Sequence, residues 1–392
     1  MTRNLRIMSL VSLCQDTASE LLYPVLPIFL VGVLGAPVAV VGVVEGLADG
    51  AASITKLASG KISDRRNRRP LVALGYGIAA VAKLVVAIAV VWPMVLVARV
   101  ADRIGKGIRG VPRDALIADG TPAEFRGRAF GFHRSVDTWG AVIGPLLGLG
   151  LYHLFGGNVR PLLLIAVIPA FASAALVFLV REVPRPAPIK GDESSAQPAS
   201  RPTANPTLPP AFWKAMVPLG IFAMVNFSDA LLLLRAQHLG LGVGGVIGVY
   251  CLFNLTYALG SYPAGALSDR LSRPFVVGAG LLVFAAAYIA LGLAPWAGWV
   301  WIIFPVYGLY SAFTDGVGKA WVVDLVPATA RGWAIGVHGA VSGVGAIVAG
   351  LWAGLAWSGG GSGPLVLAGS VAAAVGVFVI ADRRRLGGRV VG

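Results

Sequence analysis

Long apolar segments separated by short polar loops fill almost all of the 392-residue chain. An α-helix needs about 20 mostly apolar residues to cross the hydrocarbon core of a bilayer. The pattern therefore predicts an all-α membrane protein with twelve transmembrane helices. The expected helices span residues 8–30, 38–60, 70–92, 94–117, 127–152, 160–181, 213–236, 243–266, 274–294, 298–323, 331–356 and 362–381.

The composition agrees with a membrane environment. The chain is 57% hydrophobic and 13% charged, whereas about 25% of the residues of a soluble domain are charged. Too little polar surface remains to cover a soluble globule, so hydrocarbon is the expected solvent for most of the exterior. Cys14 and Cys251 lie inside apolar segments, where free thiols are expected rather than a disulfide framework. Residues 1–6 precede the first segment without a small-residue cleavage site, which favours a retained first helix.

Basic residues gather in every second loop. The formal net charge is +14, but this placement is typical of the positive-inside pattern and not of a nucleic-acid-binding surface. The remaining loops are short turns in which only Arg160 is basic. Both termini are therefore expected on the cytoplasmic face of the cell or inner membrane. The loop residues concerned are Arg65, Arg66, Arg68, Arg69, Arg126, Arg128, Arg270, Arg273, Arg331, Arg383, Arg384 and Arg385.

One polar loop returns 205 residues later in the chain. The same offset relates two further blocks, without a gap in the register. Such a repeat predicts two homologous halves, the sequence form of a two-fold repeated membrane transporter. Matching pairs include Gly60 and Gly265, Ser63 and Ser268, Asp64 and Asp269, Arg68 and Arg273, Asp119 and Asp324, Arg126 and Arg331, and His133 and His338.

Residues 183–212 interrupt the pattern. They are rich in Pro, Ser and charged residues, a composition that predicts a disordered or extended linker. The expected organisation is a six-helix half at residues 1–182, a cytoplasmic linker at 183–212, and a second six-helix half at 213–392. The second half ends in a basic tail, which is expected at the lipid headgroups.

Two acids stand close together in the first apolar segment. Asp16 and Glu20 are four residues apart, so they share one face of a helix near the middle of the span. Acids at that depth are costly and are expected to face a cavity and have a function. Close carboxylates share protons, which predicts a proton-coupling or cation-binding pair. The alternative is a structural ion pair with Lys83 or Arg99.

Further polar residues lie inside the other apolar segments. Asn226 and Asp229 occupy the corresponding part of the seventh segment, so each half would bring an acid to a central cavity. The alternative for these charges is mutual ion pairing. The predicted cavity set is Asp16, Glu20, Glu45, Asp49, Arg103, Arg109, Asp137, Asn226, Asp229, Asp315 and Lys319.

Cofactor chemistry is not indicated by the sequence. No cluster has closed metal-ligand spacing, and no phosphate-binding loop is present, so ATP is not expected to drive the protein directly. We therefore expect no metal site, no cofactor and no enzymatic activity.

The loop at residues 60–69 has the pattern Gly-x-x-x-Asp-Arg-x-x-Arg-Arg, which resembles the signature loop of the major facilitator superfamily. The resemblance implies that the acid contacts a helix N-terminus of the opposite half and keeps the cytoplasmic side shut. Alternatively, the charges only set the topology. The implied gate residues are Gly60 as a close-packing glycine, Asp64 as the acid, Arg65 and Arg69 as lock and headgroup anchors, Arg68, and Gly265, Asp269 and Arg270 in a degenerate second copy.

A second motif lies in the fifth apolar segment. Gly140, Gly144, Pro145 and Gly148 form the pattern Gly-x-x-x-Gly-Pro-x-x-Gly, which resembles a motif of proton-coupled exporters in the same superfamily. Its glycines allow close helix approach and its proline a bend. The alternative is ordinary packing of small residues.

The resemblance implies a secondary active transporter that works by alternating access. Proton-coupled export of a drug, metal or metal chelate by a monomer is the main expectation, with protons and a small molecule or ion as partners. Three stretches together resemble one prokaryotic branch of the superfamily, which looks related to nickel-resistance exporters. They are Asp-x-x-Ser-Glu at 16–20, Glu-Gly at 45–46, and Asp-Arg-x-Gly-Lys-Gly-x-Arg-x-x-Pro-Arg-Asp-Ala-Leu at 102–116. The tail at 382–392 lacks the histidines that those exporters often carry. One alternative is an importer of an anionic metabolite that uses the arginines of the fourth expected helix, at 94–117. A non-transporting membrane receptor on the same fold is the other.

Overall fold

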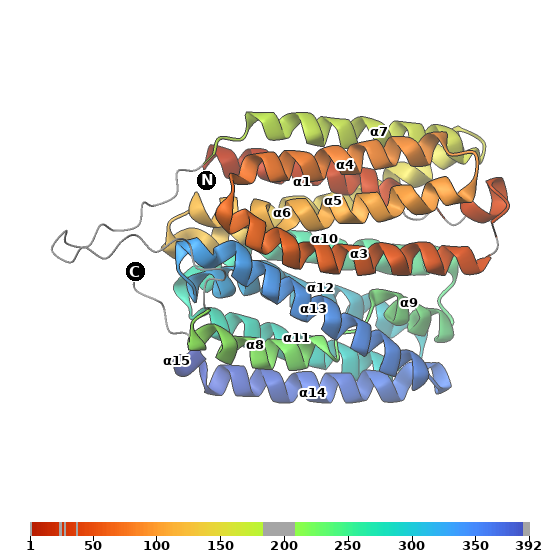
Figure 1. The fold of residues 1–392 in the computed structure, drawn as a ribbon. Coiled ribbons are helices and arrows are strands. Elements are labelled where there is room, and N and C mark those ends of the chain that lie inside the picture. The colour runs from red at the N-terminus through yellow and green to blue at the C-terminus, as the bar shows by residue number, and fades with distance from the viewer. Residues whose placement is uncertain (1, 23–25, 27–28, 37, 183–207, 387–392) are drawn as a thin grey trace.

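The computed structural model describes residues 2–22, 26, 29–36, 38–182 and 208–386, and the side chains of a few helical residues in these ranges fall outside the description. The described residues form helices and turns, without a β-strand. The helices run side by side in an elongated bundle, and the start of its first helix, at Arg3, lies at the same end as its last one, at Arg383–Leu386 (Figure 1). We call this the terminal end, and the opposite one the far end.

The helices up to residue 179 form a first set. In it, α1 packs against α6 and α7, α4 packs against α5 and α7, and α3 packs against α5. The elements are α1 (Arg3–Leu22), the π-helical turn η1 (Phe29–Val33), α3 (Val38–Arg65), α4 (Arg68–Ile88), α5 (Trp92–Asp119), η2 (Ala123–Phe125), α6 (Arg126–Leu154), α7 (Val159–Leu176) and η3 (Val177–Leu179).

The helices from residue 210 onwards form a second set. In it, α11 packs against α14 and α12, α10 packs against α12, and α13 packs against α8. The elements are α8 (Pro210–Ala223), α9 (Asp229–His238), α10 (Val243–Arg270), α11 (Arg273–Leu293), η4 (Ala297–Trp299), α12 (Val300–Asp324), η5 (Ala328–Ala330), α13 (Arg331–Leu355), η6 (Gly359–Gly361), α14 (Ser362–Ala381) and α15 (Arg383–Leu386).

The helix boundaries repeat with the offset found in the sequence. α3 and α10 begin at residues 38 and 243, α4 and α11 at 68 and 273, and α6 and α13 at 126 and 331, a separation of 205 residues each time. The ends of α5 and α12, at 119 and 324, show the same separation. The repeated loops therefore occupy equivalent places in the two sets.

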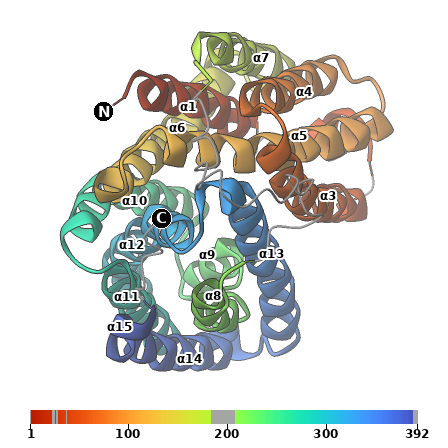
Figure 2. The same ribbon diagram turned by 60° about the vertical axis from the view of Figure 1, so that its left-hand side comes forward.

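Two helix pairs join the sets. α6 packs against α10 and α3 packs against α13, as the second view shows (Figure 2). Glycines allow this approach: a Cβ on Gly60 would stand 2.8 Å from the carbonyl oxygen of Gly332 and 3.2 Å from the Cα of Gly336. Gly265 meets Gly127 and Gly131 in the same way on the other pair. The close-packing role expected of Gly60 is thus present in both copies of the loop.

The expected uninterrupted helix at 213–236 is wrong. α8 ends at Ala223 and α9 begins at Asp229. Polar side chains stabilise this break, because Asn226 donates through Nδ2 to the hydroxyl of Tyr310 at 3.0 Å, and the Ser228 hydroxyl accepts from the backbone N–H of Ala230 at 3.3 Å. Side chains of this kind compete with helical backbone hydrogen bonds.

The number of membrane spans is not confirmed at twelve. Six described helices are long and apolar enough to cross a membrane by length and composition alone. α1 and α5 carry several charged residues each, and the segment 210–238 is divided between α8 and α9. The six are Arg68–Ile88, Val159–Leu179, Arg273–Leu293, Ala297–Asp324, Ala328–Leu355 and Ser362–Ala381.

Candidate functional site

A carboxylate of the first set binds the N-terminus of a helix in the second set. Asp64, near the end of α3, accepts hydrogen bonds from the backbone N–H groups of Gly332 at 2.8 Å and Trp333 at 2.6 Å. These N–H groups belong to the first turn of α13, where an anion is stabilised by donors without a partner in the helix and by the helix dipole. Lys61 adds a cation–π contact, with its Nζ 4.7 Å from the Trp333 ring centroid.

The second copy of the loop makes the equivalent contact in the opposite direction. Asp269, near the end of α10, accepts from the backbone N–H groups of Gly127 at 2.8 Å and Arg128 at 2.9 Å. These residues begin α6 of the first set. We call these two contacts, that of Asp64 and that of Asp269, the carboxylate latches.

A buried ion-pair triad stands beside each latch. Asp119 at the end of α5 binds Arg68 of its own set and, at 2.5 Å, Arg331 of the other. Asp324 at the end of α12 binds Arg273 of its own set at 2.5 Å and Arg126 of the other at 2.6 Å. Corresponding members of the two triads are again 205 residues apart. The terminal end is therefore closed by two related sets of charge-assisted contacts.

The arginines of the signature loop have different surroundings. Arg68 is buried and takes part in the triad, while Arg69 donates through Nη2 to the carbonyl of Phe178 at 2.6 Å. The side chains of Arg65 and Arg270 are exposed at the terminal end. The buried arginine of this loop is therefore Arg68, and not Arg65 or Arg69, which were expected to form the lock.

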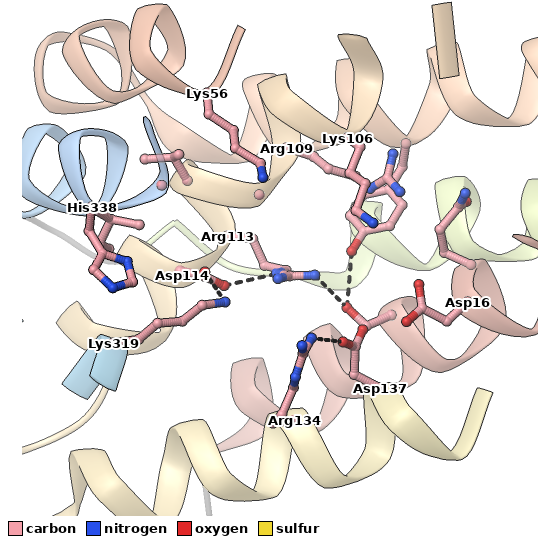
Figure 3. Close-up of a pocket in the computed structure, with 17 residues that line it drawn as sticks. Asp16, Lys56, Lys106, Arg109, Arg113, Asp114, Arg134, Asp137, Lys319 and His338 are labelled. Atoms are coloured by element: carbon pink, nitrogen blue, oxygen red, sulfur yellow. Dashed lines mark hydrogen bonds and ion pairs between the residues drawn. The ribbon is translucent and has the colours of Figure 1, made fainter. Parts of the chain in front are cut away.

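A charged cavity of about 300 Å³ lies deeper in the bundle, between the two sets. Figure 3 shows side chains from α1, α3, α5 and α6 of the first set and from α12 and α13 of the second converging on it. Its ionisable lining residues are Asp16, Lys56, Lys106, Arg109, Arg113, Asp114, Arg134, Asp137, Lys319 and His338.

Two ion pairs in this cavity link the sets. Lys319 on α12 binds Asp114 on α5, with 2.6 Å between Nζ and Oδ2. Arg134 on α6 binds Asp315 on α12 at 2.6 Å and also contacts the hydroxyl of Tyr257 on α10. Arg134 additionally binds Asp137 of its own helix at 2.8 Å. Both pairs hold α12 against the first set, whereas the latches act on α13 and α10.

A stripe of cations runs along the cavity face of α5. Arg109 stacks over the ring of Tyr76 at 4.6 Å and donates to the carbonyl of Gly75 at 3.5 Å. Arg113 binds Asp114 at 3.0 Å and donates to the hydroxyl of Ser12 at 3.0 Å. Lys106 precedes them by one turn. Positions 106, 109 and 113 share one face of a helix, and we call them the α5 basic stripe.

The predicted acid pair lies on the cavity side of α1. Asp16 lines the cavity, and within the described residues neither Asp16 nor Glu20 has an ion pair within 4 Å. The structural alternative does not apply, because Lys83 binds Asp102 at 2.9 Å and Arg99 approaches the same acid at 3.9 Å. Asp16 instead shares the cavity lining with Lys106, Arg134 and Asp137.

The glycines of the Gly-x-x-x-Gly-Pro-x-x-Gly motif, which lies on α6, pack against this acid pair. A Cβ on Gly140 would lie 2.7 Å from the Cβ of Asp16, and one on Gly144 would lie 2.7 Å from the Cβ of Glu20. Gly148 faces Leu21, and Pro145 lies within α6. The motif thus forms the surface on which α1 rests.

The other predicted site residues are distributed unevenly. Arg109, Asp137 and Lys319 line the cavity, and Asp315 reaches it through Arg134. Asp229 and Asn226 do not line it: Asp229 accepts from Tyr307 at 2.7 Å, within a cluster of aromatic rings. Arg103 lies outside the lining and interacts electrostatically with Glu20 and Lys106. Glu45 and Asp49 are on α3, but their side chains fall outside the described residues.

Five charged lining residues were not among the predicted site residues. A usable signal was present for those on α5 and α6, because their charges recur three or four residues apart along otherwise apolar helices. The residues are Lys56, Lys106, Arg113, Asp114 and Arg134. In the part of the chain that the structure describes, no group of three or more His, Cys, Asp or Glu side chains is placed to hold a metal ion.

Comparisons with known proteins agree on one family. The model described as Major Facilitator Superfamily matches residues 8–255 and 222–390. An uncharacterised MFS-type transporter of Methanocaldococcus jannaschii is 30% identical over 366 residues, which cover 91% of this chain and 89% of that protein. An uncharacterised protein of Mycobacterium tuberculosis is 30% identical over 339 residues, covering 83% and 79% of the respective chains.

Solved structures share the fold. The human organic anion transporter MFSD10 superposes with a TM-score of 0.74 at 16% identity, covering 96% of this chain and 99% of that one. The E. coli fucose:proton symporter superposes with a TM-score of 0.74 at 12% identity, covering 97% and 98%. Identities this low establish the fold and not the substrate.

Proposed function

The chain belongs to the major facilitator superfamily and is a membrane transporter, not an enzyme, and on that premise we propose that it moves a small molecule or ion by alternating access coupled to protons. The observation that carries this proposal is the pair of carboxylate latches. Asp64 and Asp269 each bind the first turn of a helix in the opposite set, and the charged cavity lies beneath them.

The latches support a mechanism in which the two halves rotate as rigid bodies about the cavity. Residues 1–182 and 213–392 would move as the two halves, joined by the linker at 183–212, with twelve membrane spans in total. The latches, the triads and the two cavity ion pairs all lie within nine residues of a helix end at the terminal end. Hydrogen bonds to charged groups contribute about 1.5–3 kcal/mol each, enough for a few of them to set a conformational equilibrium.

The terminal end is proposed to face the cytoplasm of the cell or inner membrane. The loops at this end carry the basic residues that the positive-inside rule places there.

The protein would work as a monomer surrounded by membrane lipid. The lipid would cover the large apolar side chains that the surface exposes, such as Leu355, which is 90% exposed, and Ile54, which is 76% exposed.

Proton coupling is assigned to Asp16 and Glu20. An uncompensated charge in the middle of a span costs about 2.5–3.5 kcal/mol on insertion scales, and protonation removes that cost. Neither acid has an ion pair within 4 Å in the described part of the chain, whereas Asp102, Asp114 and Asp137 each do. The unpaired acids are therefore the better proton carriers. A receptor without transport would have no use for them.

The expected export of a drug, metal or metal chelate remains a prediction. It rests on the resemblance of the Gly-x-x-x-Gly-Pro-x-x-Gly motif to that of exporters. The contacts of Gly140 and Gly144 with α1 account for these glycines without fixing a direction of transport. The basic lining of the cavity favours the alternative substrate, an anion.

Alternating access can be tested without knowledge of the substrate. Spin labels on N67C and S272C, two repeat-related exposed positions, report the terminal end, while labels on V90C and S358C report the far end. We expect pulsed electron resonance to show the first distance lengthening as the second shortens when Asp64→Asn is introduced. Two distances that never change in opposite senses, across variants and pH, would refute the proposal.

A further inference from the structure

The cavity carries more positive than negative charge. Its lining includes six basic residues, Lys56, Lys106, Arg109, Arg113, Arg134 and Lys319, and three acidic ones, Asp16, Asp114 and Asp137. With histidine neutral, six minus three leaves a formal excess of three positive charges among the lining residues, or two when Asp315, which binds Arg134 at 2.6 Å, is included. An excess of this size inside a membrane protein is costly unless an anion or solvent compensates it.

The acids of the cavity do not form ion pairs with all of its basic residues. Asp114 takes Lys319 and Arg113, and Asp137 takes Arg134. In the described residues, Lys106 has no hydrogen bond or ion pair. Arg109 has one long hydrogen bond to a carbonyl and a contact with the Tyr76 ring. The α5 basic stripe therefore retains donors that face the cavity and can bind a further anion.

The chemistry of these donors matches carboxylates. A guanidinium group presents planar paired N–H donors that bind a carboxylate through both oxygens, and an ammonium group adds a point charge. A volume of about 300 Å³ is at the lower end of the range for ligand pockets. A small ligand with more than one anionic group is the solute that this lining compensates best.

We propose that the cavity binds a small organic anion with two or three carboxylates on the α5 basic stripe, and that a proton on Asp16 is carried in the same direction. This inference rests on the proposed function, because it names the substrate class of the same cavity. Lys319 and Arg134 reach the cavity from opposite sets, so an anion held between them and the α5 basic stripe contacts both halves of the molecule. A ligand shifts a conformational equilibrium only through contacts that differ between the two states.

The sign of the coupling follows from the neighbours of Asp16. Asp16 lines the same cavity as Lys106 and Arg134, so in its ionised form it competes with the substrate for these two cations. Protonation removes that competitor and raises the formal excess of charge from three to four. Proton and anion therefore favour each other's binding, as linkage requires. On α5, Lys106 faces this part of α1, and Arg113 contacts it through Ser12. On α6, Arg134 and Asp137 face it, and His133 contacts it through Ser9. Glu20 lies on α1 itself, and on α7 Ser173 is a neutral partner of Gln15.

This coupling differs from proton antiport. In an antiporter the proton and the substrate compete for the protein, whereas here they bind together. Where the proton gradient points into the cell, cotransport drives uptake of the anion.

The binding test uses the purified full-length chain and its thermal unfolding. Fumarate and tricarballylate are the anionic probes, inorganic phosphate is the inorganic one, and nickel chloride and tetraphenylphosphonium are the cationic ones, all at equal ionic strength. Fumarate or tricarballylate is expected to raise the Tm, and more strongly at mildly acidic than at neutral pH. Stabilisation by the cationic probes alone would overturn the anion assignment.

Substitutions locate the site. Lys106→Gln should raise the Kd of the carboxylate about tenfold or more, because a hydrogen bond to a charged group is lost. Lys106→Arg should restore most of the affinity. Lys214→Gln, an exposed lysine on α8, is the matched control and should bind normally. Equal weakening by both glutamine variants would show a non-specific charge effect, and phosphate binding as tight as fumarate would show an inorganic anion site. Either result would overturn the proposal.

Transport decides the direction of the proton. In proteoliposomes containing a pH-sensitive dye, entry of labelled fumarate should acidify the lumen, and Asp16→Asn should leave fumarate binding intact while its pH dependence is lost. Acidification of the outside as fumarate enters would overturn cotransport. Absence of any fumarate transport, with the spin-label distances still alternating, would reject this substrate class and leave the alternating mechanism standing.

Discussion

Lys319 and Asp114 occupy the same position of the 205-residue repeat and form an ion pair with each other, with 2.6 Å between Nζ and Oδ2. One belongs to α12 and the other to α5. Equivalent residues of two repeated halves meet where the halves face each other across their approximate two-fold axis. Two identical charges at this position would repel each other. The two copies of the repeat instead carry an acid and a base here, and their ion pair joins the halves.

Reversing one member of this pair should destabilise the closed arrangement. Lys319→Asp places two acids against each other, and we expect a loss of about 3 kcal/mol, the lower part of the range for breaking a buried pair, since the Lys319 side chain is 26% exposed. Thermal unfolding in detergent measures the change. The double variant Lys319→Asp with Asp114→Lys should recover much of the stability, and a double variant as unstable as the sum of both single variants would argue against a direct pair.

The contact between α6 and α1 predicts a sharp difference between two glycines of one helix. Gly144→Ala adds a Cβ that would stand 2.7 Å from the Glu20 Cβ, so α1 must shift. We expect a loss of about 1–3 kcal/mol, typical of overpacking, together with impaired proton coupling. Thermal unfolding and proton flux in proteoliposomes are the measurements.

The matched control is Gly150→Ala on the same helix, where an added Cβ meets nothing within 4 Å. This variant should be neutral or slightly stabilising, because alanine favours a helix by up to about 1 kcal/mol relative to glycine. Similar losses at both positions would show that backbone propensity, and not the contact with α1, explains the first result.

The carboxylate latches predict that Asp64→Asn opens the terminal end. The asparagine keeps a hydrogen-bond acceptor but loses the charge that the α13 N-terminus stabilises, worth up to about 2 kcal/mol in partly buried geometries. Disulfide formation between K61C and W333C, in a background without Cys14 and Cys251, should become slower and less complete.

Asp269→Asn should act in the same direction through the related contact with α6, and both substitutions together should have a larger effect than either. Glu124→Gln, an exposed acid at the same end, serves as the control and should leave cross-linking unchanged. Full cross-linking in the Asp64→Asn protein would remove the latch from the mechanism.

The orientation in the membrane predicts which loops a reagent outside the cell can reach. Ser272 directly precedes α11 at the terminal end, Ser358 lies between α13 and α14 at the far end, and both serines are exposed. Ser358 is a better site than the neighbouring Gly360, whose positive φ of 74° disfavours a side chain. A membrane-impermeant thiol reagent applied to intact cells should label only S358C. Labelling of S272C instead would reverse the proposed topology.

Much of the helical framework was readable from local sequence. The offset of 205 residues reappears in the boundaries of α3 and α10 and of α4 and α11, because each boundary is set by the nearby change from apolar to polar residues. The resemblance of the signature loop to the major facilitator superfamily implied that its acid contacts a helix N-terminus, and Asp64 makes this contact with α13. The break between α8 and α9 was missed because its residues are as apolar on average as their neighbours.

The pairing of charges was decided only by the tertiary structure. The sequence placed Asp16 and Glu20 on one face of α1 but could not show that Gly140 and Gly144, over 120 residues away, form the surface against which they pack. It likewise gave no partner for Arg134, which binds an acid 181 residues later in the chain. Apolar periodicity records which face of a helix is buried, whereas an ion pair between two halves depends on how their surfaces dock. That docking, which also builds the basic cavity, follows from the packing of whole helices and is not recorded in any local stretch of the chain.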